Sequence, residues 1–126
     1  MESIYEEILE RSKSPTNFGE LKNPDLHIED INPLCGDKIE IFAKIENSKI
    51  KEIKFKGAGC AINKASTDIL LDTLKEKNIK EIKNITNEDF LDLLGIKVSP
   101  MRLKCALLGL VAIKKGISDL ENDIRN

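Results

Sequence analysis

Aromatic side chains are scarce in this sequence: Trp is absent, and four Phe and one Tyr make up 4% of the residues. Proteins that bind single-stranded nucleic acids commonly stack the bases on aromatic rings, so this shortage argues against that class. Positive charge is not in excess either, because 20 Lys and Arg face 22 Asp and Glu, for a net charge of -2. A polyphosphate is attracted by a basic surface. We therefore expect no nucleic-acid partner.

No apolar stretch is long enough to span a bilayer. The longest run covers residues 106–113 and is interrupted by Gly109, whereas a transmembrane helix needs roughly 20 apolar residues. The N-terminus, Met1-Glu2-Ser3, is acidic where a signal peptide is basic. We therefore expect a cytoplasmic protein without a membrane partner. Its 126 residues favour a single domain over positions 1–126.

Histidine and phosphate-binding glycine motifs are also nearly missing. His27 is the only histidine. It lies in a predicted strand among charged residues, where a surface histidine is a better interpretation than a general base for a cysteine nucleophile. The segment Gly57-Ala58-Gly59 lacks the lysine and the third glycine of phosphate-binding loops. Residues 66–68 (Ser66, Thr67 and Asp68) are interpreted as ordinary polar residues of a helix.

Strands are predicted in the first half of the chain, where apolar residues alternate with polar ones. Leu26 and Ile28 predict a short strand at a sheet edge. Residues 38–56 predict a hairpin that turns at Asn47-Ser48.

Helices follow from apolar residues at helical spacing. They are expected at residues 3–13, at 62–77, in short pieces over 79–94 with Thr86 as an N-cap, and from Ser99-Pro100 to Gly116. A polar helix or tail is expected from about residue 117 to 126. Strands early and helices late indicate an α+β fold, with a small antiparallel sheet of about three strands and helices packed on one face.

The three cysteines, Cys35, Cys60 and Cys105, are too few and too widely spaced for a disulfide framework. Spacing alone favours buried thiols that act as small hydrophobic residues. Their neighbours favour a different interpretation. Cys35 lies two residues before Asp37 in a turn, and a thiol and a carboxylate at this spacing can both face one ion, although turn chemistry alone also explains the motif.

The other two cysteines lie near helix starts. Cys60 follows a glycine-rich turn at a predicted helix N-terminus, where amide groups and the helix dipole stabilise a thiolate. Cys105 lies among leucines, after the cations Arg102 and Lys104. Three thiolates and one carboxylate suit either a tetrahedral zinc ion or a two-iron two-sulfur cluster, and the soft sulfur ligands exclude magnesium and calcium.

Four segments resemble one family, the IscU/SufU/NifU-type iron–sulfur cluster assembly scaffolds. They are the N-terminal part with Tyr5, Ile8 and residues 14–19, the motif Asn32-Pro33-Leu34-Cys35-Gly36-Asp37, residues 54–62 followed by Ala65-Ser66, and residues 99–105. The resemblance covers nearly the whole chain, and its motifs occur in the family's order. It implies a SufE/NifU-like version of the α+β fold.

By this resemblance, Cys35, Asp37, Cys60 and Cys105 are the ligands of a 2Fe-2S cluster, of iron or of zinc. A cysteine desulfurase would supply sulfur as a persulfide, and apo iron–sulfur proteins would receive the cluster. The persulfide acceptor would be Cys105 in an IscU-like mechanism and Cys35 in a SufU-like one.

The chain combines features of two branches of that family. Lys104 stands where IscU proteins have histidine, as in SufU proteins, whereas the spacing between Cys60 and Cys105 is the shorter, IscU-like one. Residues 98–102 keep little of the IscU chaperone-binding segment, which argues against a dedicated Hsp70-type chaperone as a partner.

Three functions are compatible with these residues. The first is a non-enzymatic scaffold on which a labile 2Fe-2S cluster is built and passed on. The second is an enzyme, a zinc-dependent SufU-like sulfurtransferase that relays persulfide sulfur. The third is a structural zinc site, which ranks last because such a site seldom needs a labile aspartate. The composition permits a monomer or a dimer.

Overall fold

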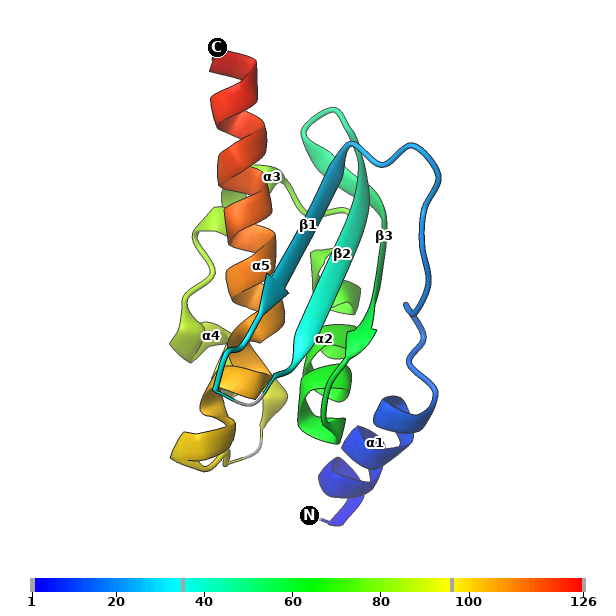
Figure 1. Ribbon diagram of the computed structural model, residues 1–126, viewed down its shortest axis with the longest axis vertical. Coiled ribbons are helices and arrows are strands. Elements are labelled where there is room, and N and C mark those ends of the chain that lie inside the picture. The colour runs from blue at the N-terminus through cyan, green and yellow to red at the C-terminus, as the bar shows by residue number, and fades with distance from the viewer. Residues whose placement is uncertain (1, 35, 96, 126) are drawn as a thin grey trace.

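The protein is described by a computed structural model that covers residues 2–34, 36–95 and 97–125. Three antiparallel strands form its sheet in the order β1 (Leu26–Ile31), β2 (Lys38–Glu46) and β3 (Lys49–Ala58) (Figure 1). The edge strand and the hairpin predicted from the sequence are therefore confirmed. The hairpin turns at Asn47 and Ser48, which both have positive φ angles, of 53° and 63°. Such a two-residue turn matches the right-handed twist of the paired strands.

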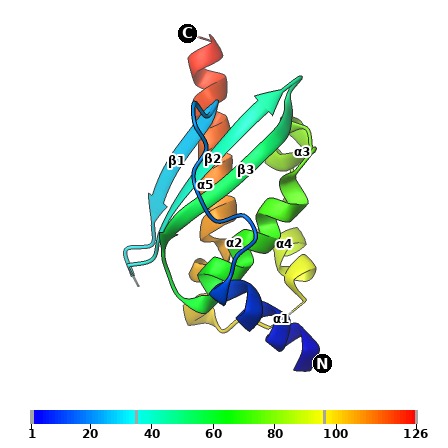
Figure 2. The same ribbon diagram turned by 90° about the vertical axis from the view of Figure 1, so that its right-hand side faces the viewer.

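Five helices accompany the sheet among the described residues. They are α1 (Glu2–Lys13), α2 (Ala61–Leu74), α3 (Ile79–Lys83), α4 (Asn87–Leu94) and α5 (Pro100–Arg125). Helix α5 packs on β1 and β2, and α2 packs on β3 and α5, so both cover the same face of the sheet (Figure 2). The predicted α+β architecture is confirmed. No helix in the described part of the chain is both long and apolar enough to cross a membrane.

The hydrophobic core lies between the sheet and helices α2 and α5. Ile39, Ile41 and Phe55 contribute from the strands, and Leu70 and Leu110 from the two helices, each almost fully buried. The strand residues alternate with charged ones on the opposite face, as expected for an antiparallel sheet that is covered on one side. This core holds the N-terminal ends of α2 and α5 close to one end of the sheet.

The short helices between α2 and α5 begin and end as the sequence predicts. Thr86 is the N-cap of α4: its hydroxyl accepts a hydrogen bond from the Asp89 N–H, and the Asp89 carboxylate accepts one from the Thr86 N–H. Gly95 ends the helix in the left-handed conformation, with φ at 69°. The capping box thus begins α4 and the glycine C-cap ends it, and both are formed by residues close in sequence.

The predicted end of the last helix at Gly116 is wrong, because α5 continues through this residue to Arg125. Gly116 instead faces β1: a Cβ atom there would lie 3.0 Å from Leu26 Cδ2 and 3.2 Å from Ile28 Cβ. The glycine therefore permits the helix to approach the edge strand closely. Residues 117–125 belong to the same helix and do not form a separate polar element.

The interpretation of Asp68 as an ordinary polar residue is also wrong. Asp68 is completely buried in α2. Its carboxylate accepts hydrogen bonds from the Arg11 guanidinium (2.9 Å), the Thr16 N–H (3.1 Å) and the Asn17 N–H (2.8 Å). These bonds attach the end of α1 and the following loop to α2, and the same loop then pairs with β3 through bonds between Asn17, Gly19 and Phe55.

Candidate metal centre

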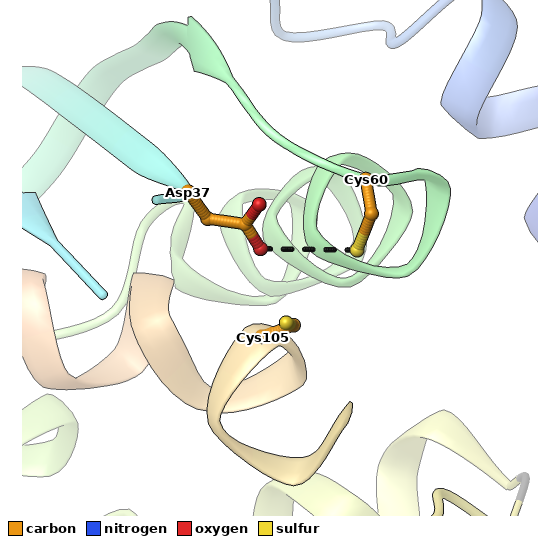
Figure 3. A group of neighbouring side chains, drawn as sticks. All are labelled: Asp37, Cys60 and Cys105. Carbon is orange, nitrogen blue, oxygen red and sulfur yellow. Dashed lines mark hydrogen bonds between the residues drawn. The ribbon is translucent and has the colours of Figure 1, made fainter. Parts of the chain in front are cut away.

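Asp37, Cys60 and Cys105 meet at the end of the sheet where β2 begins and β3 ends (Figure 3). One ligand atom of each residue lies within 4.8 Å of those of the other two. The Cys60 thiol is 3.8 Å from Asp37 Oδ2. Three of the four predicted ligands are thus brought together by three different elements. The fourth, Cys35, lies outside the described residues.

Asp37 is positioned by a tight loop between β1 and β2. The Asn32 N–H donates to the Asp37 carbonyl at 2.8 Å, and the Gly36 N–H donates to the Asn32 carbonyl at 2.7 Å. The Asn32 side chain accepts a third bond, from the Leu34 N–H at 3.1 Å. Asn32 is a positioning residue that the sequence reasoning missed, although an asparagine two residues before its hydrogen-bond donor is a known turn signal. The loop leaves the Asp37 side chain only 7% exposed.

Cys60 is the N-cap of α2. It has extended backbone angles, and its sulfur accepts a hydrogen bond from the Asn63 N–H at 3.4 Å. The glycine-rich turn before it therefore does what the sequence predicts, since it delivers a thiol to a helix N-terminus. Amide groups at a helix N-terminus favour negative charge nearby, which suits a cysteine that coordinates a metal through its sulfur.

Cys105 lies one turn into α5 and is 5% exposed. Its carbonyl oxygen accepts a hydrogen bond from the Asn63 side-chain amide at 3.1 Å. Asn63 is 2% exposed, and the sequence reasoning missed it as well. An asparagine inside a helix carries no signal that would reveal a contact with a second helix more than forty residues away.

The nearest cationic side chain along β2 is directed away from this cluster. The Lys38 ammonium lies 2.7 Å from Glu29 on the outer face of the sheet, and this hydrogen bond raises the pKa of Lys38. Arg102 and Lys104 are exposed on α5. The ligand atoms that the described residues offer to a metal are therefore two sulfurs and one carboxylate oxygen. This set fits zinc or iron and does not fit the all-oxygen shells of magnesium and calcium.

Gly57 packs directly against the backbone of Lys38, the residue after Asp37, and its replacement by alanine should lower the stability of the fold. Its φ is 151°, and a Cβ atom would lie 2.1 Å from the Lys38 carbonyl oxygen. Because backbone must move, we expect Gly57→Ala to lower the free energy of unfolding by about 2 kcal/mol or more in urea titrations. Gly19→Ala is the control, since its φ is 142° but the nearest atom is the flexible Lys54 Cδ at 3.5 Å. Equal losses in both variants would contradict the role given to the Gly57–Lys38 contact.

Comparison with known proteins places this geometry in a family. Residues 4–125 match the NifU-like N terminal domain family. The zinc-dependent sulfurtransferase SufU of Bacillus subtilis is 29% identical over 96% of this chain and 94% of its own length. The iron–sulfur cluster assembly enzyme IscU of Drosophila melanogaster is 32% identical over 91% of this chain and 76% of its own. The crystal structure of the N-terminal part of a NifU-like protein from Brucella abortus shares the fold, with a TM-score of 0.78 at 19% identity over 96% of each chain.

Proposed function

The chain belongs to the NifU-like N terminal domain family, and from that premise we propose that it is a scaffold for iron–sulfur cluster assembly. In this role Cys35, Asp37, Cys60 and Cys105 bind a 2Fe-2S cluster as cargo, which is then passed to apo iron–sulfur proteins. The relatives named as IscU scaffolds, in Archaeoglobus fulgidus and Thermotoga maritima, support this assignment. We also propose that residues 1–126 act as one domain in the cytoplasm, as a monomer or a dimer.

One observation carries the proposal: a buried carboxylate lies beside two thiols from separate helices. A cluster that remains in place for electron transfer is typically held by four thiolates. An oxygen ligand in place of the fourth sulfur is harder and binds iron less tightly than a thiolate does. Asp37 therefore gives the cluster a weaker attachment at one point, which suits transfer to another protein.

Delivery of sulfur by a desulfurase requires a nucleophilic thiolate among the residues of the proposed metal centre. We propose Cys105 as the acceptor, with Cys35 as the alternative. The thiolate attacks the outer sulfur of a persulfide on a cysteine desulfurase, a new sulfur–sulfur bond forms, and the desulfurase cysteine leaves as a thiolate. Leu34, which precedes Cys35 in the sequence, and Met101, one turn before Cys105 on α5, are 78% and 89% exposed. Exposed apolar side chains next to the reacting groups are consistent with docking of a protein partner.

A second function is supported by the donor set and by one relative. Two thiolates and a carboxylate also suit zinc, and the Bacillus subtilis relative is named a zinc-dependent sulfurtransferase. In that case zinc would hold the resting thiolates, and this chain would be an enzyme that relays persulfide sulfur without building a cluster.

Anaerobic reconstitution separates the two functions. The purified chain is incubated with ferrous iron, cysteine and a cysteine desulfurase, and absorption and Mössbauer spectra are recorded. We expect the bands and quadrupole doublet of a 2Fe-2S cluster. A colourless product that retains tightly bound zinc and accelerates desulfurase turnover would contradict the scaffold function and support the sulfurtransferase function. No cluster, no zinc and no acceleration would overturn both.

Asp37→Ala tests the role of the oxygen ligand. If this carboxylate is the weak point of attachment, its removal closes a route by which water or an incoming thiol displaces iron. We therefore expect the reconstituted cluster to survive several times longer in Asp37→Ala than in the wild-type protein. Bleaching of the visible absorption after transfer to a chelator measures the lifetime. Faster loss than in the wild-type protein would contradict the role.

A further inference from the structure

Asn63 connects the two described thiol ligands. Its backbone N–H donates to the Cys60 sulfur at 3.4 Å, and its side-chain amide donates to the Cys105 carbonyl at 3.1 Å. Asn63 is 2% exposed, and its bond to Cys105 is buried, while its bond to the Cys60 sulfur is partly buried. One residue on α2 therefore contacts its own N-cap cysteine and the backbone of the cysteine on α5.

A second contact between the same helices lies four residues further along each of them. Thr67 lies four residues after Asn63 on α2, and Gly109 lies four residues after Cys105 on α5. A Cβ atom at Gly109 would lie 3.0 Å from Thr67 Oγ1, so the helices approach closely at this point. Residues four apart lie on one side of a helix. The two contacts thus follow one line along both helices, at the end of the helices where the ligands lie.

The Asn63 side chain is itself held in place by the turn before Cys60. A Cβ atom at Gly59 would lie 2.3 Å from Asn63 Oδ1, so the amide rests directly on the glycine backbone. The amide has little room to rotate between Gly59 and the Cys105 carbonyl. Its position is set by the same turn that carries one ligand, while its hydrogen bond is made to the residue that carries another.

We propose that Asn63 is a positioning residue that sets the separation of the Cys60 and Cys105 sulfurs before metal or cluster binds. This inference rests on the proposed metal centre. The Thr67–Gly109 contact and the core residues beyond it join the two helices further along, away from the ligands. The bond from Asn63 to Cys105 supplies the second point of attachment, at the level of the ligands. Without it, each binding event must first bring the two helix starts together, which weakens binding.

Cobalt(II) titration of the apo protein tests the inference, because sulfur-to-cobalt charge-transfer and d–d bands report sulfur ligation and tetrahedral geometry. We expect Asn63→Ala to fold, as judged by circular dichroism, and to bind cobalt about 10- to 100-fold more weakly with altered d–d bands. Ser66→Ala is the matched control. It removes a buried polar group of the same helix whose hydroxyl has no hydrogen-bond partner in the described structure, so wild-type affinity and spectrum are expected.

The outcomes separate the inference from the function on which it rests. If the wild-type protein shows no sulfur-to-cobalt band, the metal centre itself is wrong. If the wild-type protein binds cobalt and folded Asn63→Ala binds it equally well with the same spectrum, Asn63 has only a structural role and the inference is overturned. Should Asn63→Ala fail to fold, Asn63→Ser replaces it, since its shorter side chain cannot reach the Cys105 carbonyl. Wild-type affinity in that variant overturns the inference in the same way.

Discussion

Replacing Asp68 with alanine is expected to lower the free energy of unfolding by about 3 kcal/mol or more, because it leaves the backbone N–H groups of Thr16 and Asn17 without their acceptor and removes one partner of Arg11. The carboxylate is fully buried and accepts bonds from the Arg11 guanidinium, from the Thr16 N–H and from both the backbone and the side chain of Asn17. Among the described residues, Asp72 also accepts from the side chains of Arg11 and Asn17, whereas the backbone N–H groups of Thr16 and Asn17 donate to Asp68. For a chain of this size the loss corresponds to a decrease in Tm of roughly 10 °C.

The loss should be concentrated at the N-terminus. Amide hydrogen exchange of α1 and of the loop at Thr16 and Asn17 should accelerate in Asp68→Ala more than exchange in the hairpin of β2 and β3. Asp72→Asn is the matched control, because Asp72 also binds Arg11 (2.8 Å) and Asn17 (2.9 Å) but its side chain is 36% exposed. An exposed ion pair contributes only about 0–1 kcal/mol. Equal destabilisation by both variants would contradict the importance given to burial.

Asp72 contributes a pH dependence to the attachment of α1. Burial opposes ionisation of its carboxyl, but hydrogen bonds from Asn17 and Arg11 outweigh that effect and lower its pKa below the usual 3.8. A lowered pKa in the folded state means that the contribution is present above pH 3.8 and is lost as the pH falls through the folded-state value. The contribution of Asp72 to the attachment of α1 should therefore be unchanged between neutral and mildly acidic pH.

Cys60 has two roles that can be separated by two substitutions. As the N-cap of α2 it accepts a backbone hydrogen bond, and as a proposed ligand it provides a sulfur. Cys60→Ser keeps a capping oxygen but removes the soft ligand, whereas Cys60→Ala removes both. We expect both variants to bind zinc at least about 100-fold more weakly, since the 10–16 kcal/mol typical of a four-ligand zinc site is shared among its ligands. Only Cys60→Ala should lose stability without metal, by about 1 kcal/mol.

Competition with a chromophoric chelator measures the affinity, and urea unfolding of the apo protein measures the stability. The comparison is decisive because the two effects move independently. Zinc affinity in Cys60→Ser that remains within a few-fold of the wild-type value would exclude the sulfur as a ligand. Equal apo stability of Cys60→Ala and the wild-type protein would show instead that the capping bond contributes little.

Features that depend on neighbouring residues in the chain were predictable from the sequence. The turn at Asn47-Ser48, the Thr86 N-cap and the arrival of Cys60 at a helix N-terminus each follow from a few adjacent residues. The same is true of the loop that places Asp37, since its turn residues surround it. Local geometry of this kind is decided by backbone preferences and short-range hydrogen bonds, and the predictions for these segments are confirmed.

Features that depend on distant contacts were not predictable. Glycine is common at helix C-termini, so Gly116 predicted a helix end, yet β1 packs against it and the helix continues. In the sequence Asp68 resembles an exposed polar residue of a helix, but in the folded protein α1 and the loop after it cover this residue. Asn63 reaches Cys105 only because α2 and α5 cross where they do. In each case the partner lies on another element, and neither periodicity nor capping rules carry that information.

The three described residues of the proposed metal centre lie on segments that are distant in sequence and adjacent only in the folded chain. An ion or cluster held by them binds the native state and not the unfolded one, so mass action couples loading to folding. At a ligand concentration a hundred times the Kd, the native state gains about 2.7 kcal/mol. When the ion or cluster leaves, the native state loses this stabilisation. A scaffold that has just delivered its cluster is then less protected from unfolding and proteolysis than one that is loaded, and its lifetime in the cell depends on how quickly it is filled again.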